Sequence, residues 1–391
     1  MTKHLTFGLT FGLVFAALVF IVQILLAPGV LSPAPVKTDP KKVLSESSSP
    51  KQILGFYPYW NLSKLDELDF SALTGIYYFA VDLSPDGSFN TADPGWSRLH
   101  SGAFTKLQEK AKKNNVRLGV TIINLDQDSI AKNVNNSDRR QTIINNTVNL
   151  MKQYGFVDLN IDLEYVGLND LGLTKNFSDF VADLSESVHN TILGSTVSLD
   201  TFADSIVKPR IFDTASLAQS LDYIIIMGYD FHRINSFRAG PVAPLFGREN
   251  YEYDIYTSVT DYLKTVPKEK VILGVPFYGY EWPVEAPEKA SFVISSYHGP
   301  EISSYRRSLE TAKANNAAIN FDDTSKSVWF SYYDAPYKTW RQVWFENERS
   351  LGLKFDLVNQ ANLSGIAIFA LGYDGASAAP LWTTVREKLK Q

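Results

Sequence analysis

The chain contains no cysteine and few histidines. Without cysteine among its 391 residues, it cannot form disulfide bonds, thiolate metal sites or cysteine nucleophiles. The five histidines are scattered, and no two of them stand at the spacing of a metal-binding pair. We therefore expect the protein to work without a metal ion or another cofactor.

The chain also lacks a strong excess of charge of either sign. Its formal net charge is -5, a balance that gives no reason to expect nucleic acid as a partner. No Gly-x-Gly-x-x-Gly motif follows the first strand-like segment, which argues against a bound dinucleotide. Aromatic residues make up 13% of the chain, a content that suits sugar-binding clefts and hydrophobic cores alike.

The amino-terminal region is the one part with a long uncharged stretch. Residues 5–27 carry no charge and, as a helix, would span a bilayer core of roughly 30 Å. We expect this segment to be a retained membrane anchor, with a cleaved signal as the alternative. The lysines beyond it oppose an exported orientation by the positive-inside rule, but first helices of this kind usually export the chain that comes after them. We therefore expect the remainder to lie outside the cytoplasm.

Residues 28–52 are rich in Pro, Ser and Lys and contain little that could be buried. This composition predicts a disordered linker between the anchor and a folded domain at 53–391.

The folded domain alternates short apolar runs with amphipathic helical stretches, a pattern typical of an α/β protein with a parallel sheet. Helices are expected at Phe104–Asn114, Arg139–Tyr154 and Phe177–Ile192, among others. Eight units of this kind favour a TIM (β/α)8 barrel over an open sheet. The expected strands lie at Ile53–Tyr57, Gly75–Ala80, Val116–Thr121, Phe156–Glu164, Val197–Asp200, Leu221–Met227, Val271–Pro276 and Gly365–Phe369.

The connection between the seventh and eighth expected strands is far longer than one helix requires. Within it we expect a strand at Phe292–Ser295, a helix at Ser303–Asn315 and a hairpin-like stretch at Ser327–Tyr333. These elements predict a small α+β insertion at 283–345 that forms a wall on the active face of the barrel. A separate carboxy-terminal domain is the alternative if residues 365–369 do not complete the barrel.

The segment Gly155–Glu164 has the strongest pattern in the chain. Apolar and polar residues alternate with the period of a strand, so Asp158, Asn160, Asp162 and Glu164 share one face. Asp162 and Glu164 would lie about 6 to 7 Å apart, close enough to share a proton near neutral pH. The alternative is an edge strand with a solvated acidic face.

This segment resembles the fourth-strand signature of glycoside hydrolase family 18, the chitinase family, which reads Asp-Gly-x-Asp-x-Asp-x-Glu with Asn common at the second Asp. Asn160, Asp162 and Glu164 match it, whereas Val157 and Asp158 stand where the family usually has Asp and Gly.

Further motifs resemble the family in the correct order, over about residues 53 to 382. Met227–Asp230 resembles the sixth-strand Met-x-Tyr-Asp motif, and Leu273–Gly279 and Gly365–Asp374 resemble the seventh and eighth strands. The run Ala239–Pro244 looks like a loop of bacterial members, including those that act on cell walls.

Position and resemblance together suggest the chemistry. Glu164 ends its strand at the barrel mouth, where catalytic groups sit, and is our candidate for the general acid. Asp162 rises from the same strand and so cannot flank the sugar from the opposite side, as the second carboxylate of most glycosidases does. The resemblance implies instead that the 2-acetamido group of the substrate attacks the anomeric carbon. Asp162 would then orient the acetamide, Tyr229 would donate a hydrogen bond to its oxygen, and Asn160 would support Asp162 or serve a purely structural role. The carboxylates from other strands that are alternatives to the acetamide as nucleophile are Asp200, Asp230 and Glu281.

The expected substrate-binding residues are mostly aromatic. Phe369 stands where the family usually places a tryptophan under the reacting sugar, and it offers less area and no indole N–H. Core packing is the alternative for each of the other candidates, which are Tyr57, Phe79, Met227, Asp230 and Trp282.

The sequence thus predicts a membrane-anchored, retaining glycosidase that acts on β-1,4-linked N-acetylglucosamine in chitin, peptidoglycan or N-glycans. A catalytically silent glycan-binding protein and a membrane-anchored scaffold that binds a protein partner are the alternatives.

Overall fold

The computed structural model describes residues 50–168, 170–375 and 379–389. The expected membrane segment at 5–27 and nearly all of the expected linker at 28–52 lie outside these residues. Within them, no helix combines the length and apolar character needed to cross a membrane.

The predicted eight-stranded barrel is confirmed. All eight strands are parallel and close in the order β1-β13-β7-β6-β5-β4-β3-β2. The strands are β1 (Gln52–Pro58), β2 (Gly75–Asp82), β3 (Arg117–Asn124), β4 (Asp158–Leu163), β5 (Thr196–Phe202), β6 (Tyr223–Met227), β7 (Val271–Pro276) and β13 (Gly365–Phe369).

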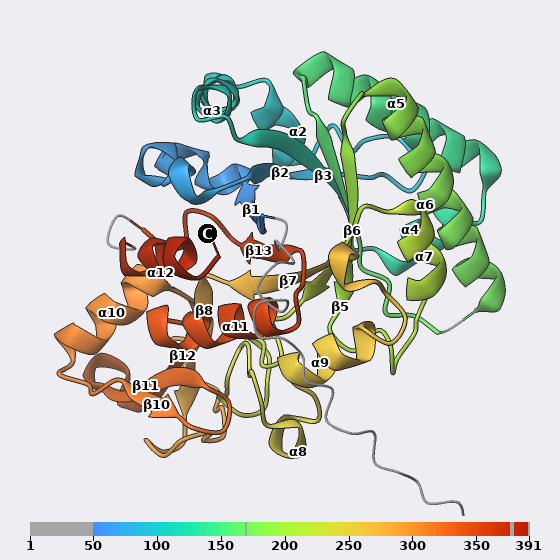
Figure 1. Ribbon diagram of the computed structural model, residues 1–391. Coiled ribbons are helices and arrows are strands. Elements are labelled where there is room, and N and C mark those ends of the chain that lie inside the picture. Colours follow the sequence, from blue (N-terminus) through green and yellow to red (C-terminus); the bar gives the residue numbers. More distant parts are fainter. Residues whose placement is uncertain (1–49, 169, 376–378, 390–391) are drawn as a thin grey trace, which may run out of the picture. The chain divides into compact units, whose positions relative to one another are not determined.

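Helices follow most strands and flank the barrel on the outside, as α5, α6 and α7 do in Figure 1. The α-helices are α2 (Pro94–Leu99), α3 (Gly102–Lys113), α4 (Gln127–Val134), α5 (Ser137–Tyr154), α6 (Leu171–Thr191), α7 (Thr214–Ser220), α8 (Arg248–Tyr251), α9 (Ile255–Tyr262), α10 (Tyr305–Ala314), α11 (Glu348–Gln360) and α12 (Ala379–Leu389). Four short 3-10 helices complete the set, namely η1 (Tyr59–Glu67), η2 (Phe70–Ala72), η3 (Lys268–Lys270) and η4 (Ala335–Tyr337).

Local signals fix where the central strand β4 begins. The side chain of Asn136 caps the start of α5 by accepting a hydrogen bond from the Arg139 N–H, at 3.0 Å. The helix ends at Gly155, whose φ of 69° is a conformation that glycine adopts without strain. Phe156 then buries its ring, and β4 enters the barrel at Asp158.

The barrel interior has an apolar part and a polar part. Strands β1, β2, β6, β7 and β13 supply the apolar part: Leu54, Phe56, Tyr77, Phe79, Ala80, Ile225, Ile272 and Ala367 form one cluster. Strands β3, β4 and β5 supply buried polar side chains on the inward face, which are Thr121, Asp158, Asn160, Asp162, Ser198 and Asp200. The acidic row of β4 therefore faces an enclosed polar interior, not bulk solvent.

The predicted insertion is present as a five-stranded sheet in the order β10-β11-β12-β8-β9, with helix α10 alongside. Its strands are β8 (Tyr278–Val284), β9 (Glu301–Ser304), β10 (Asn320–Asp322), β11 (Ser327–Asp334) and β12 (Thr339–Phe345). The expected strand at Phe292–Ser295 is wrong, because Phe292 and Val293 make only isolated bridges, to Arg238 and Val284. A segment held at single points on two different neighbours cannot extend a ladder.

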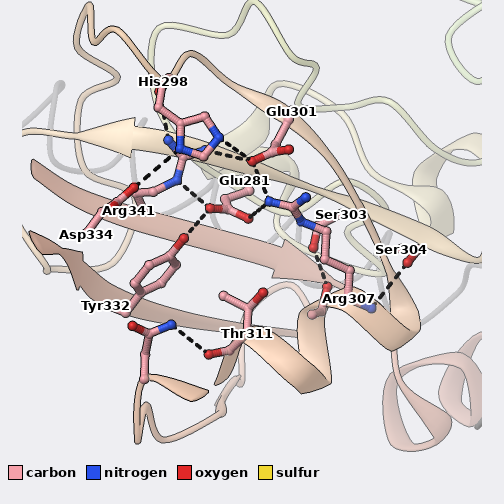
Figure 2. A network of polar contacts seen from close by, with 12 residues as sticks. Glu281, His298, Glu301, Ser303, Ser304, Arg307, Thr311, Tyr332, Asp334 and Arg341 are labelled. Carbon is pink, nitrogen blue, oxygen red and sulfur yellow. Dashed lines mark hydrogen bonds and ion pairs between the residues drawn. The ribbon is translucent and has the colours of Figure 1, made fainter. Parts of the chain in front are cut away.

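A buried ion pair links the elements of this sheet (Figure 2). Glu281 on β8 and Arg341 on β12 are both fully buried and joined directly. Tyr332 on β11 donates a hydrogen bond to Glu281, and Arg307 on α10 donates another at 3.3 Å. Arg341 also donates to the carbonyl oxygen of His298 at 2.8 Å. One carboxylate thus connects three strands and a helix.

This ion pair generates a prediction about stability. The substitution Arg341→Met leaves Glu281 without its closest cation, and breaking a buried pair in this way costs about 3 kcal/mol or more of the free energy of unfolding. Urea unfolding monitored by tryptophan fluorescence measures the change. In the control Lys175→Met, which removes an exposed pair with Asp179, the loss should stay below about 1 kcal/mol. Equal losses in the two variants would contradict the role assigned to Arg341.

Candidate active site

A cavity of about 640 Å³ lies at the carboxyl end of the barrel strands, where side chains from different strands converge. Asp162 on β4 and Glu164 directly after it line this cavity together with residues in β2 and β13, in or after β5 and β6, and after β7. The other expected site residues in its wall are Phe79, Met227, Tyr229, Asp230 and Phe369.

Glu164 stands directly after the last residue of β4. Its backbone is held on both sides: its N–H donates to the Asn124 carbonyl at 3.1 Å, and its own carbonyl accepts from Gln127 Nε2 at 2.8 Å. Burial raises the pKa of the Glu164 carboxyl, Arg233 opposes that shift, and the nearby charge of Asp230 adds to it. A fixed carboxyl with a raised pKa is suited to donate a proton.

Asp162 lies deeper in the barrel. Burial raises its pKa well above the usual range, and the charges of Asp200 and Glu164 add to this effect. Asp158, at the start of the same row, has partners for its charge. It forms an ion pair with Arg117 and accepts a hydrogen bond from the Thr196 N–H at 2.8 Å. The acidic row therefore divides into a neutralised lower end and an uncompensated upper end.

Asn160 lies between these two ends, with its side chain fully buried. Its Nδ2 donates to Ser198 Oγ and to Asp200 Oδ1, both at 3.1 Å. The expectation that Asn160 supports Asp162 does not match these contacts, since both partners of Asn160 lie on the adjacent strand β5.

Tyr229 and Asp230 follow β6 and contact the aromatic side of the cavity. The Tyr229 ring stacks on Phe369, with centroids 5.7 Å apart and planes 19° apart. Burial and the surrounding carboxylates raise the Tyr229 pKa well above its usual value, so its hydroxyl remains a hydrogen-bond donor. Asp230 accepts hydrogen bonds from Tyr278 and, at 3.1 Å, from Tyr280, which fixes this carboxylate from the side of the insertion.

Two expected substrate-binding residues lie outside the cavity wall. Tyr57 is fully buried, packs in the core between barrel and helices, and donates its hydroxyl to the Asn61 carbonyl at 2.7 Å. The inward position on β1 belongs to its neighbour Phe56. Trp282 lies on β8 of the insertion sheet, is fully buried, and donates a hydrogen bond to the Arg233 carbonyl at 3.1 Å. Core packing, the alternative considered for both, is what the structure displays.

Several cavity residues were missed from the sequence or given another role there. Tyr278 belongs to the seventh-strand motif, which could have identified it as a cavity residue. Asp200 is expected from the sequence only as an alternative nucleophile. The cations Lys208, Arg210, Arg233 and Arg248 also line the cavity, but they lie in loops or, for Arg248, at the start of the short helix α8, in segments without a recognisable sequence pattern. Glu281, another alternative carboxylate, is engaged in the ion pairs of Figure 2. No cluster of metal-ligating side chains occurs among the described residues.

Curated proteins are similar to this chain in sequence. A putative sporulation-specific glycosylase, YdhD, of Bacillus subtilis is 30% identical over 240 residues, which are 61% of this chain and 52% of the relative. The cortical fragment-lytic enzyme of the same organism is 25% identical over 298 residues, 73% of this chain and 64% of the relative. The matches thus span between half and two thirds of these relatives.

Solved structures agree in fold. The group IV chitinase of Ostrinia furnacalis in complex with allosamidin superposes with a TM-score of 0.77 at 22% identity, covering 87% of this chain and 99% of that one. The spore cortex-lytic enzyme SleL of Bacillus megaterium gives 0.70 at 20% identity, covering 88% and 75%. The model of the family described as glycosyl hydrolases family 18 matches residues 52–374, and the chain belongs to this family.

Proposed function

We propose that the protein hydrolyses β-1,4-linked glycans that contain N-acetylglucosamine, with Glu164 as the general acid. The observation that carries this proposal is the placement of Glu164. It is a backbone-anchored carboxyl in the wall of the barrel cavity, and its pKa is raised by burial. Relatives described as a cortical fragment-lytic enzyme and, in human, as a di-N-acetylchitobiase support this substrate class.

The proposed nucleophile is the acetamido oxygen of the substrate, so the reaction retains the β configuration. Of the carboxylates that could attack instead, Glu281 is held in ion pairs and Asp230 accepts two tyrosine hydroxyls. Asp200 lies on β5, the strand next to β4, and so rises beside Asp162. In this mechanism Asp162 accepts a hydrogen bond from the acetamide N–H and stabilises the positive charge that develops on the acetamide. Tyr229 donates a hydrogen bond to the acetamide oxygen.

The first prediction tests the acid. Glu164→Gln preserves the size of the side chain but cannot donate the proton, so turnover should fall by about 100-fold or more, while oligosaccharide binding is retained. Product formation from chitooligosaccharides and from purified peptidoglycan measures the first effect, and calorimetry measures the second. A fall of less than about tenfold would place the acid elsewhere, and binding without product in the unaltered protein would favour a silent glycan-binding protein.

The next prediction tests the nucleophile. If the acetamide attacks, a substrate with glucosamine in place of N-acetylglucosamine before the scissile bond should not be cleaved. The first product should be the β anomer in rapid NMR spectra, and a thiazoline that mimics the cyclic intermediate should inhibit. An α product would rule out retention, and a trapped glycosyl ester on Asp200 or Asp230 would indicate covalent catalysis.

The charge of the cavity wall favours a leaving sugar with an acidic substituent. The aromatic rings of Phe79 and Phe369 lie at the ends of β2 and β13, across the barrel from the cations that follow β5 and β6. If the reacting sugar packs on Phe369, the leaving sugar lies beyond Glu164, toward those cations. Asp204 pairs with Lys208 and Arg210, whereas Arg233 and Arg248 make no ion pair with a described residue.

This charge pattern predicts a substrate preference. Arg248→Gln should raise KM by about tenfold for a tetrasaccharide that alternates N-acetylglucosamine with N-acetylmuramic acid, because a hydrogen bond to a charged group contributes about 1.5 kcal/mol. The neutral chitotetraose serves as the control and should be cleaved with an unchanged KM. An equal rise in KM for both substrates would show that Arg248 does not recognise the carboxylate.

A further inference from the structure

The strongest unexplained feature of the site is a pair of buried carboxylates on adjacent strands. Strands β4 and β5 pair in parallel, with Asn160 opposite Ser198 and Ile161 opposite Leu199. Asp162 and Asp200 each stand one residue further along, so they lie side by side at the same level of the barrel. Both line the cavity, and their exposed fractions are only 3% and 4%.

The hydrogen bonds of this pair are unequal. Asp200 Oδ1 accepts from Asn160 Nδ2 at 3.1 Å, whereas Asp162 Oδ1 is buried with no hydrogen-bond partner among the described residues. A buried acceptor without a donor is destabilising. The unpaired Oδ1 of Asp162 can therefore either carry a proton or accept a hydrogen bond from an N–H of the substrate.

The charges of the pair are also uncompensated. Two carboxylates side by side in a buried site do not both ionise readily near neutral pH. Among the described residues the charged groups that act on this pair are Glu164 and each other, while Arg233 acts at the Glu164 end. Burial raises the pKa of both carboxyls well above the usual range. The charges of Asp200 and Glu164 add to the shift at Asp162. At Asp200 the hydrogen bond from Asn160 opposes the shift and the Glu164 charge adds to it.

We propose that Asp200 is a positioning residue that shares one proton with Asp162 and takes it over when the substrate binds. This inference rests on the proposed function. As the acetamide N–H reaches Asp162, the O–H bond on Asp162 breaks and an O–H bond forms on Asp200, so no proton enters or leaves the site. Asp162 is then ionised where positive charge develops on the acetamide, and the proton returns when that charge is lost.

The residue at position 160 explains why the proton is shared with a residue of the neighbouring strand β5. An amide side chain has no proton that it can give up near neutral pH, so Asn160 cannot share one with Asp162. It can donate a hydrogen bond, and it does so to Asp200. Asn160 thus orients the second carboxylate, while Asp200 supplies the titratable group that β4 itself lacks at this level.

The test is the pH dependence of turnover in Asp200→Asn, which keeps the size of the side chain and an acceptor for Asn160. In the unaltered protein, rising pH removes the shared proton and leaves two negative charges near Glu164, which delay the loss of the Glu164 proton. The variant can hold only one such charge, so Glu164 should ionise earlier. The alkaline limb of the kcat/KM profile should move to lower pH by about one unit, and kcat should fall by about 100-fold.

Two further variants separate charge from structure. Ser198→Ala removes the other acceptor of Asn160 without changing any charge, and its pH profile should match that of the unaltered protein. The double substitution Asn160→Asp with Asp200→Asn returns a carboxylate to the same pocket from β4, and should bring the alkaline limb back toward its original position. Circular dichroism spectra establish that each variant is folded.

If Asp200→Asn left both the alkaline limb and kcat unchanged, the inference would be overturned. Residue 200 would then serve only to accept the hydrogen bond from Asn160, and its carboxyl would not share a proton. A double variant whose profile stays that of Asp200→Asn would also count against it. If the unaltered protein forms no product from any glycan, the proposed function itself fails, and this result is distinct from either outcome.

Discussion

The polar part of the barrel interior is the constraint on which the site depends. Strands β3, β4 and β5 place an amide, hydroxyls and three carboxylates in a volume that most parallel barrels fill with branched apolar side chains. Burying uncompensated carboxylates is costly, and this cost becomes useful where a reaction needs a carboxyl that is still protonated near neutral pH. The lower end of the row is stabilised by Arg117, so the free charge is confined to the end that faces the cavity.

The period-two alternation of Gly155–Glu164 predicted both β4 and the common face of its polar residues, because every second residue of a strand meets the same environment. The eight strands were predictable for a related reason: each is a short apolar run separated from the next by a helical stretch. These are local signals, and the fold adds only their closure into a ring.

Where prediction failed, the missing information was not local. Residues 53–57 of β1 are apolar on both faces, so nothing in that run distinguishes the inward Phe56 from the outward Tyr57. The partners of Asn160 depend on the register between β4 and β5, which links residues 38 or 40 positions apart. The segment at Phe292 resembles a strand in composition, but only its neighbours in space decide whether a ladder forms.

The insertion sheet is joined to the barrel more closely than its position in the sequence implies. Strand β7 ends at Pro276, and β8 begins at Tyr278 after the single residue Phe277. The first residue of the sheet therefore also donates a hydrogen bond to Asp230 in the site. A sheet attached in this way cannot be exchanged as an independent module, because replacing it would also displace Tyr278, which lines the cavity. Changes in this sheet are thus expected to arise in β10 and β11, which lie beyond β12 in the strand order, while β8 remains fixed.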